Sequence, residues 1–181
     1  RMNISVIGAG QMGNGIAQAF AVCGYDVVMT DIARAPLDRG LATVAGSLDR
    51  LIKKEKMSAE QKAAALGHIR VSTDLAALAD SDLVIEAATE NLALKLEIFK
   101  KLDTLARPEA VIATNTSSIS ITRLAAATGR ADRVIGMHFF NPVPVMPLVE
   151  VIKGSKTSPA AVATAVAYAQ AMGKSPIVVK D

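Results

Sequence analysis

Short apolar runs alternate with longer alanine-rich or amphipathic segments along the whole chain. The apolar runs predict eight strands, at residues 4–7, 26–30, 69–72, 83–86, 110–114, 134–138, 149–152 and 177–179. Several of these runs are continuously apolar, which is typical of strands covered by helices on both faces. Helical spacing fills most of the gaps, at residues 11–22, 92–106, 121–127 and 159–172. The pattern predicts an α/β fold built on a mostly parallel sheet.

The interval at residues 34–68 is too long for an ordinary crossover between two strands. It contains two helical patterns, and the second opens with Ser58 and Gln61 at the spacing of a capping box. We therefore expect a helical hairpin at about residues 36–67 that projects from the sheet.

The first helix of this hairpin carries an apolar stripe, and its opposite face carries Thr43, Ser47, Arg50 and Lys54. Ser47 and Lys54 are seven positions apart, so at ~100° per residue they nearly eclipse, ~10 Å apart along the axis. A hydroxyl and an ammonium on one stripe suit a phosphorylated ligand, while an ordinary solvated face is the alternative. Spacing alone favours the solvated face.

The composition is that of one globular domain. Of 181 residues, 51% are hydrophobic, and 20 basic residues against 17 acidic ones give a net charge of +3. This excess is too small to indicate a nucleic-acid partner. The single cysteine, Cys23, excludes a disulfide scaffold or a cysteine-rich metal site, so we expect no metal and a cytoplasmic location.

Residues 2–25 carry no charged side chain and need to be tested as a membrane segment. Glycine, asparagine and glutamine interrupt the stretch repeatedly. A spanning helix needs ~20 mainly apolar residues and an export signal needs a compact apolar region. We therefore expect neither a membrane partner nor an export signal.

The strand at residues 4–7 runs directly into the hexapeptide Gly8-Ala9-Gly10-Gln11-Met12-Gly13. In such a G-x-G-x-x-G turn, Gly8 permits the tight turn, Gly10 lets the backbone approach a pyrophosphate, and Gly13 allows close helix packing. Asp31 follows the next strand, eighteen residues after Gly13. A carboxylate there binds a ribose diol and repels a 2′-phosphate, which favours NAD over NADP.

Three further polar clusters follow later strands, where open α/β sheets bind ligands. They are Glu86-Ala87-Ala88-Thr89-Glu90-Asn91, Asn115-Thr116-Ser117-Ser118 and His138-Phe139-Phe140-Asn141-Pro142. Glu86 and Glu90 could form a carboxylate pair for glycoside hydrolysis, but nothing in the sequence places them across a sugar. Ser117 and His138 could form a nucleophile and base, but the G-x-S-x-G elbow is absent.

A histidine at a strand end in a dinucleotide-binding domain has a simpler use. The imidazole of His138 can take a hydroxyl proton as hydride leaves the same carbon, and Glu150 on the following strand could orient it. The other histidine, His68, precedes a strand without a polar cluster, so we interpret it as structural.

Together these motifs closely resemble the 3-hydroxyacyl-CoA dehydrogenases, especially the bacterial 3-hydroxybutyryl-CoA dehydrogenases. The resemblance covers essentially the whole chain. It rests on the glycine hexapeptide, Ile85-Glu86-Ala87 with Glu90-Asn91, Asn115-Thr116-Ser117-Ser118, His138-Phe139-Phe140-Asn141-Pro142-Val143-Pro144 and Leu148-Val149-Glu150-Val151-Ile152.

The resemblance implies a Rossmann-type fold and the NAD-dependent, reversible oxidation of a 3-hydroxyacyl-CoA to the 3-oxoacyl-CoA. It implies that His138 is the general acid/base, that Glu150 is its partner, and that Ser117 bonds the reacting oxygen beside the nicotinamide. It also implies that Ser47 and Lys54 contact coenzyme A, against what spacing alone favours. The NAD site then comprises the hexapeptide with Asp31, Glu90, Lys95, Asn115, Ser117 and Asn141.

The family pattern continues past Lys180-Asp181 into an all-helical domain that forms a homodimer and closes the active site. By this resemblance, residues 1–181 are the NAD-binding domain without that helical domain, and we expect it to turn over poorly alone. Two alternatives are an NAD-dependent dehydrogenase of a hydroxy acid that is not a CoA thioester, and a non-catalytic NAD-binding or structural relative.

Overall fold

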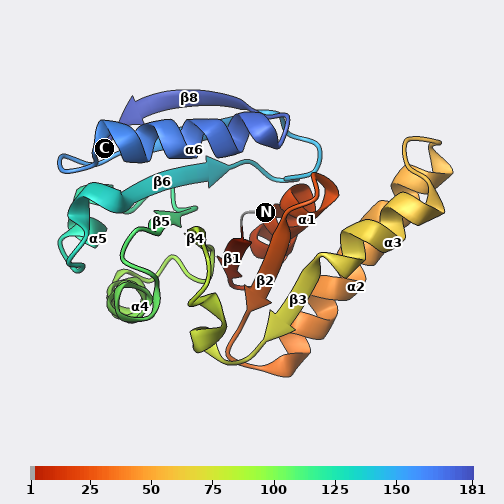
Figure 1. Cartoon of the computed structure of the whole chain (residues 1–181), viewed down its shortest axis with the longest axis horizontal. Helices are drawn as coiled ribbons and strands as arrows, with labels where there is room; N and C mark the ends of the chain where they lie inside the picture. Colours follow the sequence, from red (N-terminus) through yellow and green to blue (C-terminus); the bar gives the residue numbers. More distant parts are fainter. Residues whose placement is uncertain (1–2) are drawn as a thin grey trace.

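The computed structural model describes residues 3–181, and its eight strands form one sheet in the order β3-β2-β1-β4-β5-β6-β7-β8 (Figure 1). Strands β1 to β6 run parallel, β7 is antiparallel to β6, and β8 is parallel to β7. The strands are β1 (Asn3–Ile7), β2 (Asp26–Thr30), β3 (Ile69–Ser72), β4 (Leu83–Glu86), β5 (Val111–Thr114), β6 (Val134–Phe139), β7 (Leu148–Lys153) and β8 (Ser175–Lys180). The predicted α/β class, the mostly parallel sheet and its strands are confirmed.

Helices cover both faces of the sheet, as the continuously apolar strands predicted (Figure 1). They are α1 (Gln11–Val22), α2 (Arg34–Lys53), α3 (Ala59–Gly67), α4 (Leu92–Leu105), α5 (Ile121–Ala125) and α6 (Pro159–Ala171). Along β4, Leu83 and Ile85 join the core formed with α1 and α6, while Val84 joins the core formed with α4 and α5. Two short 3-10 helices, at Leu75–Leu78 and Ala131–Arg133, were not predicted.

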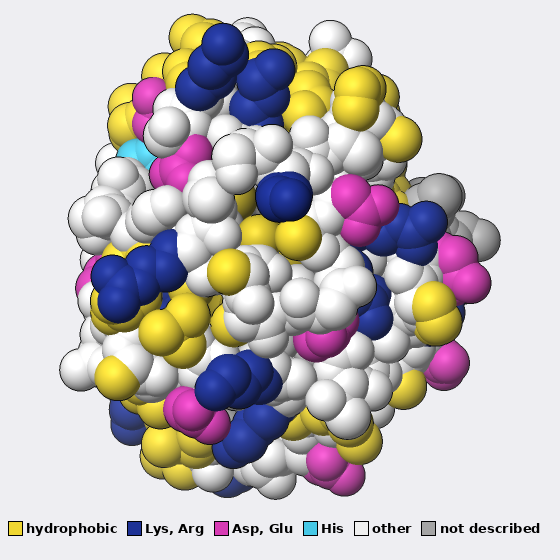
Figure 2. All heavy atoms as spheres, turned by 90° about the vertical axis from the view of Figure 1, so that its left-hand side faces the viewer, with side chains coloured by type: hydrophobic (Ala, Val, Ile, Leu, Met, Phe, Trp, Pro, Cys, Tyr) yellow, Lys and Arg dark blue, Asp and Glu magenta, His cyan; other side chains and the backbone are white. Residues whose placement is uncertain are grey.

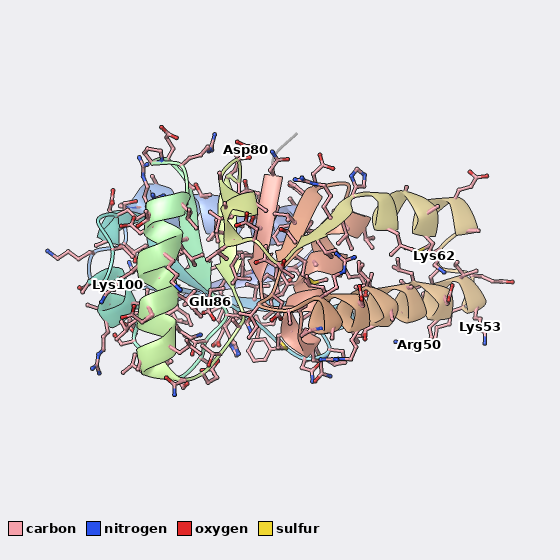
Figure 3. The ribbon with its side chains drawn as sticks, turned by 90° about the horizontal axis from the view of Figure 1, so that it is seen from below. Arg50, Lys53, Lys62, Asp80, Glu86 and Lys100 are labelled. Atoms are coloured by element: carbon pink, nitrogen blue, oxygen red, sulfur yellow. The ribbon has the colours of Figure 1, made fainter. Side chains whose placement is uncertain are left out.

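Helices α2 and α3 form the predicted hairpin, which extends away from the sheet (Figure 1). Ser58 and Gln61 make the expected capping box at the start of α3. Lys62 of α3 reaches across to α2, where its ammonium lies 2.6 Å from an oxygen of Asp49 (Figure 3). At its other end α2 packs closely on the chain before α1, because a Cβ on Gly40 would lie 2.9 Å from the carbonyl oxygen of Ala9. The hairpin is therefore anchored beside the glycine-rich turn.

The surface of the molecule gives no sign of a single dominant charge on the face formed by β8, α5 and α4. There, basic side chains are separated by acidic, apolar and uncharged ones (Figure 2). Within residues 3–181 none of the helices combines the length and the apolar character needed to traverse a lipid bilayer.

A buried arginine closes the end of α4. The guanidinium of Arg130 lies 2.7 Å from a carboxylate oxygen of Asp103 and donates to the carbonyl oxygens of Asp103, Ala106, Arg107 and Ala110. These are carbonyls at and just beyond the last turn of the helix, where no intrahelical donor remains. The side chain of Arg130 therefore supplies hydrogen-bond donors to the carbonyl oxygens at the C-terminal end of α4. It also joins this end of the helix to the segment that leads into β6.

We expect Arg130→Met to lower the free energy of unfolding by about 3 kcal/mol, because several buried carbonyl oxygens lose this donor and Asp103 loses its ion pair. Urea denaturation followed by circular dichroism measures the change. Arg123→Met is the matched control, because this exposed arginine lies on the neighbouring α5 and should change stability by no more than about 0.5 kcal/mol. Equal stability of the two variants would contradict the assignment.

Candidate active site

The candidate site lies along the carboxyl ends of the parallel strands. The strand order reverses between β1 and β4, which is where open α/β sheets form a ligand crevice. Ile7 at the end of β1 is in register with Thr30 and with Glu86, and Glu86 is in register with Thr114. The loops after these four strands therefore start at one edge. Those after β4 and β5 carry two of the polar clusters singled out in the sequence, and those after β1 and β2 carry the glycine turn and Asp31.

The glycine-rich turn is closely packed on one side and open on the other. Gly8 has a φ of +106°, and a Cβ there would lie 2.7 Å from the carbonyl oxygen of Ala87. A Cβ on Gly13 would lie 1.9 Å from the carbonyl oxygen of Gly8, so no side chain fits at either position. At Gly10 a Cβ would meet nothing within 4 Å. The backbone is thus accessible at the position predicted to face a pyrophosphate.

Helix α1 begins directly after this turn without a side chain that caps it. Its first turn contains no acidic residue. The amide of Asn14 braces the turn instead, donating to the carbonyl oxygens of Gly10 at 2.7 Å and Ala9 at 3.3 Å. The leading backbone N–H groups of α1 remain available to an anion, which the positive end of the helix dipole also favours.

Asp31 lies beside the same turn, as its position after β2 predicted. One carboxylate oxygen accepts the backbone N–H of Ala9 at 2.9 Å, and the other accepts that of Ile32 at 2.7 Å. Because each carboxylate oxygen has a second lone pair, Asp31 can still accept hydrogen bonds from a bound diol.

A buried ion pair fixes the ends of β4 and β5. The ammonium of Lys95 lies 2.7 Å from one carboxylate oxygen of Glu86, and the hydroxyl of Thr114 donates to the same oxygen at 2.8 Å. The other oxygen of Glu86 accepts the backbone N–H of Ala88 at 2.8 Å. Both side chains of the pair are at most 1% exposed. Glu86 is thus committed to internal bonds, and Glu90 binds elsewhere, so the structure does not assemble the carboxylate pair considered for glycoside chemistry.

Glu90 holds the turn that carries Ser117. One of its carboxylate oxygens accepts the hydroxyl of Thr116 at 2.7 Å and that of Ser118 at 3.0 Å. These two residues flank Ser117, whose side chain is exposed. Among residues 3–181 no hydrogen bond joins Ser117 to His138, so the alternative of a serine nucleophile with a histidine base gains no support.

His138 and Glu150 face each other across the antiparallel strands β6 and β7, where they are register partners. The Nδ1 atom of His138 lies 3.0 Å from a carboxylate oxygen of Glu150, and the imidazole is only 18% exposed. Beside it, the side-chain oxygen of Asn115 accepts the backbone N–H of Phe139 at 2.8 Å. The predicted pairing of His138 with Glu150 is therefore present, with Asn115 fixing the end of β6.

His68 also pairs with a carboxylate, but at the other end of the strands. Its Nδ1 atom lies 2.8 Å from an oxygen of Asp26, which begins β2. This pair is remote from every loop that carries a polar cluster, in agreement with the structural interpretation of His68.

Three hollows meet at the start of α1, and Gln11 lines all of them. The first, of 410 Å³, is also lined by Ala9, Gly10, Asn14, Pro36, Arg39, Gly40 and Thr43. The second, of 280 Å³, is lined by Gly10, Met12, Ala87, Ala88, Thr89, Glu90, Lys95, Asn115 and Thr116. Most of the predicted cofactor residues therefore border these two hollows or lie next to their linings.

The third hollow, of 330 Å³, is a groove between α2 and the loop at residues 141–145. Thr43, Ser47, Arg50 and Lys54 all line it, so the predicted polar stripe is one surface of one groove rather than an isolated solvated face. The side chain of Ser47 accepts a hydrogen bond of 2.9 Å from Gln18 of α1. Asn141, predicted at the cofactor, lines this groove instead of the second hollow.

Some residues that hold the site residues in place through hydrogen bonds were given no role from the sequence. Gln18 supports Ser47, while Thr114 and Thr116 bond to Glu86 and Glu90. A signal existed for Gln18, which stands four residues after Asn14 on an otherwise apolar helix. A buried polar side chain there needs a partner.

Comparisons with known proteins agree with this geometry. The chain is 48% identical to a 3-hydroxybutyryl-CoA dehydrogenase of Bradyrhizobium diazoefficiens over 98% of this chain and 61% of that protein. It is 44% identical to a 3-hydroxybutyryl-CoA dehydrogenase of Clostridioides difficile over 99% of this chain and 64% of that protein. The crystal structure of (S)-3-hydroxybutyryl-CoA dehydrogenase from Ralstonia eutropha superposes with a TM-score of 0.98 at 57% identity, over 99% of this chain and 63% of that one.

The chain thus spans less than two thirds of the length of these relatives. The family model for the NAD-binding domain of 3-hydroxyacyl-CoA dehydrogenases matches residues 3–181. On the glycine turn, the His138–Glu150 pair and these matches, the chain belongs to the 3-hydroxyacyl-CoA dehydrogenase family, as its NAD-binding domain.

Proposed function

We propose that this chain is the part of an NAD-dependent 3-hydroxyacyl-CoA dehydrogenase that binds both substrates and carries the proton-transfer residues. The reaction is the oxidation of a 3-hydroxyacyl-CoA, of short chain such as 3-hydroxybutyryl-CoA, to the 3-oxoacyl-CoA, and the reverse reduction. The observation that carries the proposal is the pairing of His138 with Glu150 at the sheet edge that also bears the glycine turn.

The residues around α1 fit NAD. The open space above Gly10 admits a pyrophosphate, and the uncapped start of α1 offers backbone donors to it. Asp31 lies beside the turn to receive a ribose diol. When bound there, NAD supplies the acceptor for the hydride that leaves C3 of the substrate. The second hollow, lined by Glu90, Lys95 and Asn115, suits its nicotinamide end.

His138 is proposed as the base that takes the C3 hydroxyl proton. The hydrogen bond from Nδ1–H to Glu150 leaves Nε2 as the atom that accepts it. The carboxylate then stabilises the imidazolium that forms, and in the reverse direction the imidazolium returns the proton. Glu150 thereby sets both the tautomer and the orientation of the ring.

Ser117 and Lys95 are proposed to act beside His138. The exposed hydroxyl of Ser117 is free to hydrogen-bond the reacting oxygen, and Glu90 fixes its turn through Thr116 and Ser118. The ammonium of Lys95 uses one donor on Glu86 and one on Thr114, which leaves its third N–H for the cofactor.

The groove between α2 and residues 141–145 is proposed to take the coenzyme A portion, with Asn141 near the junction with the cofactor. Ser47 offers a hydroxyl, and Arg50 and Lys54 offer positive charge to phosphate groups. Figure 3 shows that Arg50 points from α2 to the side away from α3, so the hairpin partner does not block it.

For the whole protein we propose a cytoplasmic homodimer that forms through an all-helical domain of the kind the family resemblance implies. The greater length of the matched relatives leaves room for such a domain. Water exclusion would then depend on it, and the isolated chain would turn over slowly.

Replacing His138 with Ala should lower kcat for acetoacetyl-CoA reduction by about 10²- to 10⁴-fold, the usual contribution of a general acid or base. The NAD affinity should stay unchanged, because the imidazole lies outside the glycine turn. Absorbance of NADH reports turnover, and calorimetry reports NAD binding.

The matched control for this experiment is His68→Ala, which removes a histidine that is also paired with a carboxylate but at the opposite end of the strands. It should retain turnover. If His138→Ala and His68→Ala were equally active, the assigned base would be wrong, and a non-catalytic relative would become the better description.

Lys54→Met should weaken binding of acetoacetyl-CoA by about tenfold, as expected when a charged hydrogen-bond donor to a phosphate is lost. Binding of free acetoacetate and of NAD should not change. Lys53→Met is the control, because this neighbouring lysine does not line the groove. Unaltered thioester affinity in Lys54→Met would favour a dehydrogenase of a free hydroxy acid.

Asp31→Ser should reduce the preference for NAD over NADP by about tenfold or more, because it removes both the acceptor for the ribose diol and the charge that repels a 2′-phosphate. Calorimetric titration with each cofactor measures the ratio. Asp38→Asn, which removes an exposed carboxylate paired with Arg34, should leave the ratio as it is. A ratio insensitive to Asp31 would place the ribose elsewhere.

A further inference from the structure

The loop at residues 140–147 joins β6 to β7, and its residues 141–145 form one wall of the groove opposite α2. Two valines of this loop have different surroundings. Val143 is buried in the core and packs against α1, where a Cβ on Gly15 would lie 3.0 Å from the Cβ of Val143. Val145 is 72% exposed, so the tip of the wall is not held by apolar packing.

The side chain of Lys174 holds this tip through hydrogen bonds to backbone carbonyl oxygens of the loop. It lies in the turn between α6 and β8, and its ammonium donates to the carbonyl oxygens of Val143 and, at 2.7 Å, Met146. These acceptors are on either side of the exposed Val145. Next to the lysine, the backbone N–H of Ser175 donates to the carbonyl oxygen of Pro147 at 2.7 Å.

The ammonium of Lys174 is partly withdrawn from water. Burial lowers its pKa, and the nearby Cys23 thiol acts in the opposite direction. No carboxylate pairs with Lys174 among residues 3–181. Its hydrogen bonds therefore go to the loop carbonyls, and charge-assisted bonds of this kind are stronger than neutral ones.

We propose that Lys174 is a positioning residue for the coenzyme A groove. It fixes the loop at residues 143–146, of which residues 143–145 line the groove opposite Ser47 and Lys54. The inference rests on the proposed function, because it assumes that this groove takes the coenzyme A portion. Lys174 does not itself line the groove, so it acts through the loop. Its hydrogen bonds go to this loop and not to the glycine turn, whose conformation depends on Gly8, Gly13 and Asn14.

The test compares Lys174→Met with Lys180→Met in this chain. Both changes remove one lysine charge at an end of β8, but Lys180 is exposed and does not contact the loop. Hydrogen exchange of the backbone amides of Val143, Val145 and Met146 measures how firmly the loop is held. Calorimetric titrations with coenzyme A and with NAD measure the two affinities. Lys174→Gln, which keeps N–H donors but not the charge, serves if the methionine variant does not fold.

We expect faster exchange in the loop and coenzyme A binding about tenfold weaker for Lys174→Met, because the loop loses both charge-assisted hydrogen bonds that hold it. The NAD affinity should stay unchanged. Lys180→Met should match the unaltered chain. A purely structural role would weaken NAD binding as well, so parallel losses of both affinities would overturn the proposal. So would an unchanged coenzyme A affinity in Lys174→Met. Failure of the unaltered chain to bind coenzyme A would instead contradict the proposed function itself, and the assignment of Lys174 with it.

Discussion

The close approach of α1 to the sheet is the constraint on which the site depends. A Cβ on Gly13 would lie 1.9 Å from the carbonyl oxygen of Gly8, a separation that no side chain can occupy. Because of this contact, α1 starts directly above the ends of β1 and β4. This position of α1 determines the size of the hollows at its N-terminus. The same approach directs the amide of Asn14 onto the carbonyls of the turn. Any residue larger than glycine at position 13 would move the helix and thereby change the shape of every hollow that Gln11 lines.

The buried polar network of Glu86, Lys95, Thr114 and Glu90 holds the loops after β4 and β5 in place by charge and hydrogen bonds. Glu86 is buried at the end of β4 and Lys95 in the first turn of α4. Removing one member of such a buried pair costs ~3–5 kcal/mol, because it leaves a buried charge without its partner. The two side chains must therefore keep close to one relative position. Thr114 links the pair to β5, and Glu90 extends the network to the turn around Ser117. Charge and hydrogen bonding here define positions that a hydrophobic core would leave less specific.

The strands and helices could be predicted from the sequence because their signals are local. Continuous apolar runs, the capping box at Ser58 and the G-x-G-x-x-G turn each arise within a few neighbouring residues, and the observed bounds agree to within two residues. Partners in three dimensions were harder to predict. Pairing of His138 with Glu150 was accessible because the two strands are adjacent in sequence, whereas the contact of Lys174 with Met146 depends on the order of strands at the sheet edge. Spacing placed Ser47 on an exposed stripe, and only the packing of α2 beside the 141–145 loop turns that stripe into a groove.

The single reversal of strand direction in the sheet explains why the proton-transfer pair and the groove occur together. A parallel crossover would carry the chain over a face of the sheet, usually through a helix, and the next strand would begin at the opposite edge of the sheet. Antiparallel β7 instead returns at once, so Glu150 comes directly opposite His138. The short connection that makes this possible must turn at the carboxyl end of β6, beside α1 and α2, and it is there that it forms the groove wall. A change that lengthened this connection would therefore alter the substrate groove before it disturbed the histidine, because the strand register holds the His138–Glu150 pair while the loop is held by the contacts of Val143 and Lys174.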